Sequence, residues 1–185
     1  MVITTHARRS LPLDYIACNL VNSNYDKTRF AAVIMRCNAP RTTALFFTTG
    51  KIVCTGAKSV DQAHKALLAF VFKLRVIGID CDPAPFQVEN IVAASGFRST
   101  NFRVCLDRIA KIETMAEYEP ELFPGLTRRV LLPDGTTSTV VVFASGKMIL
   151  TGNRRMVNVD QIFRFVQGWV LDYVEPQTKR LKRGR

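Results

Sequence analysis

The sequence contains an internal repeat, and this repeat limits the possible folds more than any other feature does. The stretch FTTGKIVCTG at residues 47–56 recurs as FASGKMILTG at residues 143–152. In both copies a Phe, a Gly-Lys pair and a Thr-Gly pair stand at the same offsets, and a Val-Asp-Gln segment follows. Such a duplication predicts two similar units, because each unit must bury its apolar face against a like neighbour.

The similarity extends upstream of these copies, where residues 29–46 correspond to residues 122–142 with a short insertion in the second copy. The alignment pairs Phe30 with Phe123, Phe47 with Phe143, and Thr55 with Thr151. We predict a first repeat at residues 1–88, a second at 89–174, and a basic C-terminal tail at 175–185.

Positive charge predominates, with a net charge of +11 and a pI near 9.9. This charge predicts attraction to polyanions, but it does not distinguish DNA, RNA, anionic lipid and acidic protein. The run KRLKRGR at residues 179–185 is typical of a solvated tail or a nuclear-import signal. Removing its five charges from +11 still leaves about +6. A basic protein made of two like units suits a pseudo-twofold ligand such as duplex DNA.

Other classes of protein are disfavoured by composition. No apolar run reaches the roughly 18 residues that a membrane span needs, and the N-terminus lacks the hydrophobic core of a secretion signal. The five cysteines are odd in number and contain no C-x-x-C pair, which favours free thiols over disulfides or a zinc site. With only two histidines, we expect no metal and no cofactor.

Strand-like and helix-like patterns alternate in the same order in both halves. Runs rich in Val, Ile, Thr and Phe predict strands at residues 31–35, 43–49, 51–56, 89–95, 138–145 and 147–152. Gly50 and Gly146 lie in tight turns that predict β-hairpins. Long helices are predicted at residues 59–77 and 160–174, and shorter ones near 14–22 and 106–114. This order predicts an α+β fold, with one curved antiparallel sheet and helices on a single side.

The predicted long helices each have an apolar stripe at helical spacing. The first stripe contains Ala63, Leu67, Phe70, Val71 and Leu74, and the second contains Ile162, Phe165, Val166, Trp169 and Tyr173. Strands such as ALFF at 44–47 and VVVF at 140–143 put apolar residues on both faces of the sheet. Because the chain has no spare helices to cover the second face, we interpret that face as a binding surface.

Four strings carry a resemblance to a known family: RFAAVIM through GAKS at residues 29–59, ENIVAAS at 89–95, YEPELFPGL at 118–126, and VVVF through TG at 140–152. Together they make residues 2–174 similar to the conserved core of the TATA-box-binding protein (TBP) family. The resemblance implies a ten-stranded, saddle-shaped sheet with helices on the convex side. It also implies a nuclear general initiation factor, or one acting at another site of cellular or viral transcription. Such a factor binds and bends A/T-rich double-stranded promoter DNA in the minor groove and nucleates the pre-initiation complex.

The resemblance assigns roles to individual residues. The DNA-intercalating positions are Phe30, Phe47, Phe123 and Phe143. The minor-groove base contacts are Asn90, Thr55, Thr151, Val2, Val53, Val92, Leu45, Val141 and Ile149. The phosphate contacts are Arg29, Arg36, Arg41, Lys51, Lys58, Arg129, Lys147 and Arg154. Amide and hydroxyl donors suit the N3 and O2 acceptors of A·T pairs without distinguishing A·T from T·A. The first-half counterpart of Asn90 would precede Met1, so we expect asymmetric recognition at the centre of the site.

Two further surfaces are implied to bind protein. The loop residues Glu119, Glu121 and Leu122 match the family's contact with general factor IIB. The family's first long helix is basic and meets factor IIA or other regulators, whereas here Leu68, Phe72 and Val76 form an apolar stripe apart from the core stripe. This departure predicts a more hydrophobic partner or a homodimer contact through the convex side.

An alternative reading is a TBP-related adaptor that acts mainly through protein contacts and binds DNA weakly or with relaxed sequence preference. The altered helix and the missing Asn favour it, and the retained Phe quartet favours the DNA-binding role. An enzyme is not expected, because the sequence offers no nucleophile with a base, no paired carboxylates in a pocket and no metal spacing.

Overall fold

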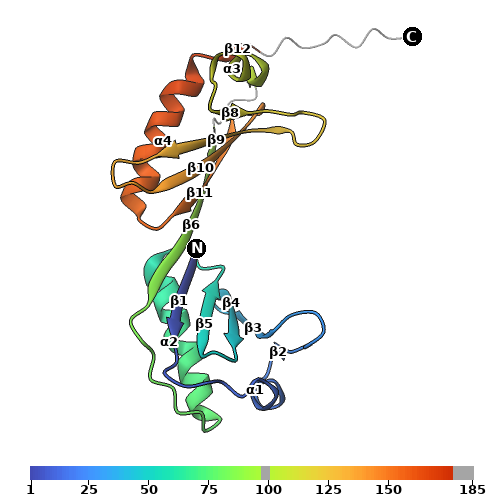
Figure 1. The fold of residues 1–185 in the computed structure, drawn as a ribbon, viewed down its shortest axis with the longest axis vertical. Coiled ribbons are helices and arrows are strands. Elements are labelled where there is room, and N and C mark those ends of the chain that lie inside the picture. The colour runs from blue at the N-terminus through green and yellow to red at the C-terminus, as the bar shows by residue number, and fades with distance from the viewer. Residues whose placement is uncertain (97–100, 177–185) are drawn as a thin grey trace, which may run out of the picture. The chain divides into compact units, whose positions relative to one another are not determined.

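The computed structural model describes residues 1–96 and 101–176. The chain divides into two compact units, Met1–Asn90 and Ile91–Arg185. In both units the elements follow one another in the same order, from a strand through a short helix and further strands to a long helix (Figure 1). The repeat limits 1–88 and 89–174 stay predictions, and residues 177–185 of the predicted tail lie outside the described residues.

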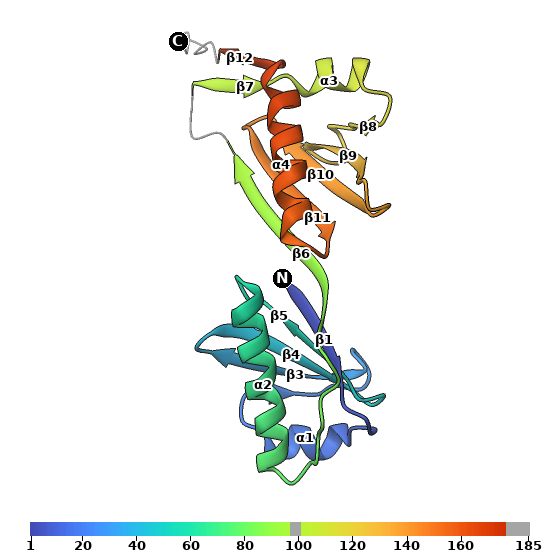
Figure 2. The ribbon, with the colours of Figure 1, turned by 90° about the vertical axis from the view of Figure 1, so that its left-hand side faces the viewer.

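The first unit packs two helices against one antiparallel sheet. Its elements are β1 (Val2–His6), α1 (Leu13–Asn19), β2 (Ser23–Asn24), β3 (Ala32–Asn38), β4 (Arg41–Phe47), β5 (Lys51–Thr55), α2 (Val60–Val76) and the first part of β6 (Gln87–Gly96). The hydrogen-bonded order is β2-β3-β4-β5-β1-β6. Figure 2 shows α2 lying across one face of these strands. Ile3, Phe46, Ile52, Phe70 and Leu74 are fully or almost fully buried between this helix and the sheet.

The second unit repeats this plan and adds a small two-stranded sheet. Its elements are the rest of β6, β7 (Phe102–Val104), α3 (Leu106–Ile112), β8 (Ala116–Glu117), β9 (Gly125–Leu131), β10 (Thr137–Phe143), β11 (Lys147–Asn153), α4 (Met156–Leu171) and β12 (Val174–Pro176). The main order is β6-β11-β10-β9-β8, and β12 pairs with β7. Its core contains Leu126, Val142, Leu150, Ile162 and Val166.

Strand β6 takes part in both units. Residues up to Asn90 pair with β1, and residues from Ile91 onward pair with β11. Hydrogen bonding therefore links ten antiparallel strands in the order β2-β3-β4-β5-β1-β6-β11-β10-β9-β8. The predicted α+β fold, with two repeats and one ten-stranded antiparallel sheet, is confirmed.

Local sequence explains where the hairpins turn and where α2 begins. Gly50 has a φ of +91°, and a Cβ there would lie 2.4 Å from the carbonyl oxygen of Arg9. Only glycine combines a left-handed conformation with so close a backbone approach. At the start of α2, the Ser59 hydroxyl accepts a hydrogen bond from the Gln62 backbone N–H, at 3.1 Å. This N-cap satisfies a donor that the first helical turn would otherwise leave free.

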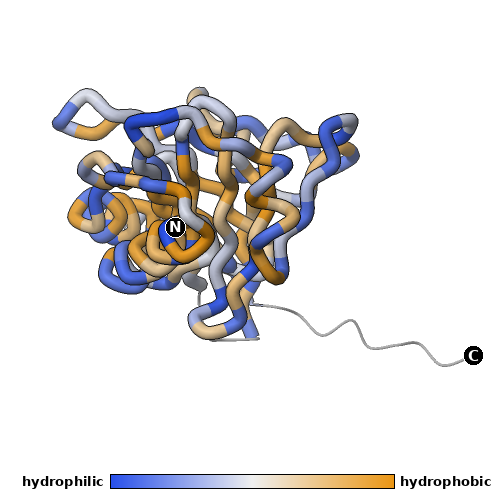
Figure 3. Tube along the Cα trace, turned by 90° about the horizontal axis from the view of Figure 1, so that it is seen from below, coloured by the Kyte–Doolittle hydropathy of each residue, from blue (hydrophilic) through white to orange (hydrophobic). Residues whose placement is uncertain are grey.

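The predicted buried face of α2 is confirmed, because Ala63, Leu67, Phe70, Val71 and Leu74 are all buried. The helical turns in Figure 3 carry hydrophobic and hydrophilic residues in alternation, as helices that bury one face should. The short helices end earlier than predicted, α1 at Asn19 and α3 at Ile112. Asn22, inside the predicted first helix, has a φ of +62°, which a right-handed helix excludes.

The prediction for α4 was wrong in its limits and partly in its face. The helix begins at Met156 and ends at Leu171, so Tyr173 lies beyond it. Phe165 is 50% exposed, and Val159 and Val170 join the core in its place. The reason is that the Phe165 ring lies beside the Arg128 guanidinium, at 5.4 Å, instead of facing the apolar core.

Candidate nucleic-acid interface

In the first unit, cross-strand rows bring together residues that lie far apart in the sequence. Residues opposite each other in neighbouring strands point to the same face of a sheet. One row contains Thr43, Thr55, Val2 and Asn90, and the next contains Ile34, Leu45, Val53 and Thr4. Their neighbours Ala44, Cys54 and Ile3 are completely buried in the helix-side core. The rows therefore occupy the face opposite α2.

The second unit has a corresponding face. One row contains Thr127, Val141, Ile149 and Ala94, and another contains Arg129, Thr139 and Thr151. Val92, which stands between the core-facing residues Ile91 and Ala93, is 50% exposed. Each unit thus gathers its own predicted minor-groove residues on the side of its sheet that lacks helices. The apolar members are mostly half-buried, so this face presents partly exposed Val, Leu and Ile side chains.

A pair of phenylalanine rings lies at one end of this face in each unit. The Phe30 and Phe47 ring centroids are 6.1 Å apart with the planes inclined at 71°, and those of Phe123 and Phe143 are 5.9 Å apart at 63°. Both geometries are edge-to-face arrangements that aromatic pairs prefer. Phe30 is 41% exposed and Phe123 is 46% exposed, whereas Phe46 on the opposite face is fully buried. The paired rings are therefore not ordinary core phenylalanines.

The same backbone turn supports the first ring of each pair. The Phe30 N–H donates to the Asp26 carbonyl, and the Phe123 N–H donates to the Glu119 carbonyl, both at 2.9 Å. In the first turn the Asp26 carboxylate also accepts hydrogen bonds from the Thr28 hydroxyl and backbone N–H. These hydrogen bonds lower the pKa of Asp26 below its usual value, and the bond from the Thr28 hydroxyl has the largest effect.

Gly125 makes room for the second aromatic pair. A Cβ at this position would lie 2.7 Å from the Phe123 ring and 3.1 Å from the Phe143 ring. The residue that occupies the same register position in the first unit is Ala32, which pairs with Phe47 as Gly125 pairs with Phe143. A small residue beneath the rings is therefore a shared structural requirement of both pairs.

The predicted phosphate contacts are all exposed cations. Those that lie on strands belong to the cross-strand rows of the helix-free face. The pairs are Arg36 with Thr43, Arg41 with Asn38, Lys51 with His6, Arg129 with Thr139, and Lys147 with Gly96. Arg29 precedes Phe30 and forms an exposed ion pair with Asp26 at 3.6 Å. Lys58 and Arg154 follow β5 and β11. The apolar residues of each unit are thus accompanied by positive charge.

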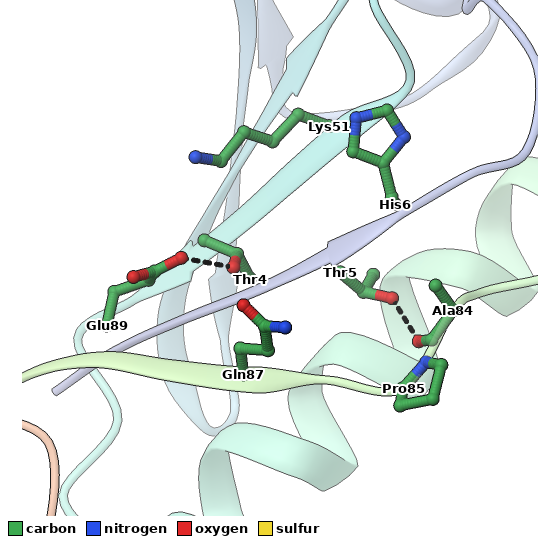
Figure 4. Close-up of a pocket in the computed structure, with 8 residues that line it drawn as sticks. All are labelled: Thr4, Thr5, His6, Lys51, Ala84, Pro85, Gln87 and Glu89. Atoms are coloured by element: carbon green, nitrogen blue, oxygen red, sulfur yellow. Dashed lines mark hydrogen bonds between the residues drawn. The ribbon is translucent and has the colours of Figure 1, made fainter.

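Sequence reasoning missed a pocket of about 350 Å³ beside Lys51 in the first unit. Figure 4 shows Thr4, His6, Gln87 and Glu89 around it. The Thr4 hydroxyl donates a 2.9 Å hydrogen bond to the Glu89 carboxylate. The alternation that begins at Val2 would have identified Thr4 and His6. The alternation of strand residues does not identify Glu89. Val2 pairs with Asn90 and the next residue, Ile3, pairs with Val88, so the register of this strand pair skips Glu89, as in a β-bulge.

The acidic loop before β9 presents the predicted protein-binding residues to solvent. Glu119 and Glu121 are exposed, and Leu122 is 81% exposed. No group of three His, Cys, Asp or Glu side chains that could hold a metal ion occurs among residues 1–96 and 101–176. Over the same residues, no helix is both long and apolar enough to cross a membrane.

The sequence matches the family model described as transcription factor TFIID (or TATA-binding protein, TBP) over residues 1–77 and 85–170. It is 36% identical over 172 residues to the TATA-box-binding protein of Tetrahymena thermophila, covering 92% of this chain and 67% of that protein. It is 38% identical over 164 residues to TATA box-binding protein-like 2 of Rattus norvegicus, covering 88% of this chain and 46% of that protein. The chain therefore spans about half the length of some curated relatives.

Among solved structures, the Methanococcus jannaschii TBP matches with a TM-score of 0.78 and 30% identity, covering 92% of this chain and 95% of that one. The sequence match and the structural match thus indicate the same family, and each covers most of the chain. The family consists of DNA-binding transcription factors and not of enzymes. The chain belongs to the TATA-binding protein family.

Proposed function

We propose that this protein is a nuclear general initiation factor that binds A/T-rich promoter DNA in the minor groove and bends it by inserting two phenylalanine pairs. The observation that carries the proposal is the placement of Phe30 with Phe47 and of Phe123 with Phe143. Both pairs lie on helix-free faces and are partly exposed. Wedging apolar side chains between base steps, for which the TATA-binding protein family is itself the standard example, costs about a few kcal/mol per step.

The rest of each face suits the floor of an A/T-rich minor groove. Apolar side chains such as Val53 and Ile149 leave no acceptor for the guanine amino group, which disfavours G·C pairs. Thr55, Thr151 and Asn90 supply hydroxyl and amide donors for the N3 and O2 acceptors of A·T pairs. The exposed Arg and Lys side chains of these faces would contact phosphates, which would fix the position of the protein on the duplex.

We further propose that assembly proceeds through protein partners at other surfaces. Glu119, Glu121 and Leu122 offer two carboxylates and a highly exposed apolar side chain. This combination suits a basic partner with an apolar pocket, as expected for a factor IIB-like protein. A factor IIA-like protein or another regulator would meet other parts of the molecule.

The test measures binding and bending of a labelled TATA duplex and of a G/C-rich duplex at one stated salt concentration. We expect the protein to bend the TATA duplex and to prefer it. Phe30→Ala and Phe143→Ala should each lower affinity by about tenfold or more, which corresponds to about 1.4 kcal/mol, and should reduce the bend.

The matched controls are Phe72→Ala and Phe102→Ala, which truncate exposed phenylalanines of the first and second units outside the two pairs. Their affinity and bend should equal those of the unchanged protein. Equal, unbent binding of both duplexes, lost steeply with salt, would contradict the wedge mechanism and leave only charge attraction.

A second candidate function is the adaptor that acts mainly through protein contacts. The observations that favour it are the carboxylate of Glu89 on the proposed DNA face and the apolar stripe on α2. If the duplex experiment shows no A/T preference, this function becomes the better account of the chain.

A further inference from the structure

Helix α2 exposes a row of large apolar side chains on the side away from its core face. Leu68, Phe72 and Val76 are 46%, 66% and 68% exposed. They stand four residues apart, so they form one ridge along the helix that is about 12 Å long at 1.5 Å per residue. These three residues do not belong to the core of the first unit. The side chains of α2 that are buried there include Leu67, Phe70, Val71 and Leu74.

An exposed aromatic ring of α1 lies near the C-terminal end of this helix. Tyr15 of α1 is 48% exposed and donates a hydrogen bond from its hydroxyl to the Ile77 carbonyl, at 3.0 Å. This bond holds the Tyr15 ring near the C-terminal end of α2. We call the surface formed by Tyr15, Leu68, Phe72 and Val76 the α2 ridge.

Positive charges accompany the α2 ridge. Lys65, Lys73 and Arg75 are exposed, and residues 65–76 contain no Asp or Glu. The C-terminal part of the helix therefore presents apolar side chains flanked by cations. A ligand that matches this surface must carry an apolar stripe with acidic residues beside it.

We propose that the α2 ridge is the docking surface for an acidic amphipathic helix of a partner protein. An i, i+4, i+8 row is the ridge that packs into the groove of a second helix. Carboxylates along the partner's stripe would meet Lys65, Lys73 and Arg75, and this complementarity would set orientation and association rate. Docking of such a helix does not require DNA binding, because the residues of the α2 ridge lie outside the proposed DNA faces.

A second copy of this chain fits the surface less well. Two α2 ridges in contact would bring Lys65, Lys73 and Arg75 of one copy towards the same cations of the other, and such like-charge contacts are unfavourable. The area is also small for a stable dimer, which typically needs about 800 Å² per partner. Four side chains supply far less than that, whereas a single helix of a few turns matches the length of the ridge.

The probe is a synthetic, cross-linked helical peptide of about five turns with Leu along one face and Glu on both flanks. Its affinity for the full chain is measured by calorimetry, together with the affinity for a TATA duplex. We expect binding that Phe72→Ser weakens by roughly tenfold or more, with the duplex affinity unchanged. The double variant Lys65→Glu with Lys73→Glu should bind the Glu peptide more weakly than the unchanged protein does. It should bind a peptide in which Lys replaces Glu more tightly.

The matched control is Leu171→Ser on α4, an exposed apolar position outside the ridge, and it should leave peptide binding unchanged. Val76→Ser serves as a second ridge variant should Phe72→Ser fail to fold, which a thermal melt would show. Failure of the Glu peptide to bind, or equal binding of a peptide with scrambled Leu spacing, would overturn the proposal. Self-association that Phe72→Ser abolishes would also overturn it, in favour of a second copy as the occupant.

Discussion

Glu89 places a carboxylate on the sheet face that also carries Val53 and Lys51. It reaches this face at the bulge in β6 and accepts a hydrogen bond from Thr4. In a complex with DNA this carboxylate would face a polyanion, and it would also reduce the local field of Lys51. Unit charges 4–10 Å apart in water interact by about 0.4–1 kcal/mol.

We therefore predict that Glu89→Gln raises affinity for a TATA duplex by about twofold to fivefold at low salt, the range that corresponds to this energy. The glutamine carbonyl can still accept from Thr4, so the fold should be kept. Fluorescence anisotropy titrations at several salt concentrations would measure the effect, which should shrink as salt rises.

The matched control is Asp61→Asn, which removes one exposed negative charge from α2 in the same unit. It should change DNA affinity much less than Glu89→Gln does. An equal gain from both variants would mean that only net charge matters, and that Glu89 does not face the duplex.

At the scale of the element, α4 is fixed to the strands by a charged cluster as well as by its apolar face. The Arg128 guanidinium lies 4.7 Å from the centroid of the Trp169 ring and forms a 3.2 Å ion pair with Glu113. The Trp169 indole N–H donates to the same carboxylate at 3.0 Å. The side chains of Arg128 and Glu113 are only 17% and 23% exposed, so little water is available to replace either partner.

We predict that Glu113→Gln destabilises the protein markedly. Removing one partner of a buried ion pair costs about 3–5 kcal/mol, and partial exposure places this pair near the lower end. The double variant Glu113→Gln with Arg128→Met should recover most of the loss, because no charge is then left without its partner and the glutamine carbonyl can still accept from the Trp169 N–H. Urea unfolding of the three proteins would measure these differences.

The control for this prediction is Asp14→Asn, which breaks the exposed Lys27–Asp14 pair and should cost no more than about 1 kcal/mol. A loss of that small size for Glu113→Gln would show that the cluster is solvated in the folded protein. Failure of the double variant to recover stability would instead assign the loss to packing against α4.

The two long helices differ in how well the sequence pattern predicts which face is buried. Helical spacing identified the core face of α2, because a capping Ser precedes the helix and apolar residues fill one side. In α4 the same spacing included Phe165, since periodicity cannot tell a ring that packs on a guanidinium from one that packs in a core. Met35 occupies the register position of Arg128 in the first unit. The repeat itself therefore gives no sign of the charged cluster.

At the scale of the whole molecule, the repeat predicted the duplicated plan and the antiparallel sheet. Patterning could not separate Phe30 from Phe46, because both are phenylalanines near strands. The resemblance to a family assigned a DNA-contacting role to Phe30 only, and in the structure Phe30 is 41% exposed whereas Phe46 is fully buried. The bulge that brings Glu89 to the proposed interface depends on pairing between strands far apart in the chain, so local sequence does not indicate it.

The net charge of +11 alone would attract any nucleic acid. The proposed interface therefore needs a test that separates the effect of cations on the proposed DNA faces from the effect of the total charge. Each cation that neutralises a duplex phosphate contributes about −0.9 to the slope of log affinity against log salt concentration. We predict that Lys51→Gln and Lys147→Gln each reduce the steepness of this slope by about 0.9 for a TATA duplex. The helix-side variants Lys73→Gln and Lys111→Gln lower the net charge equally and should leave the slope nearly unchanged. Titrations over roughly 50–200 mM salt give all four slopes, and equal reductions in all of them would show that DNA is held by diffuse charge and not by these faces.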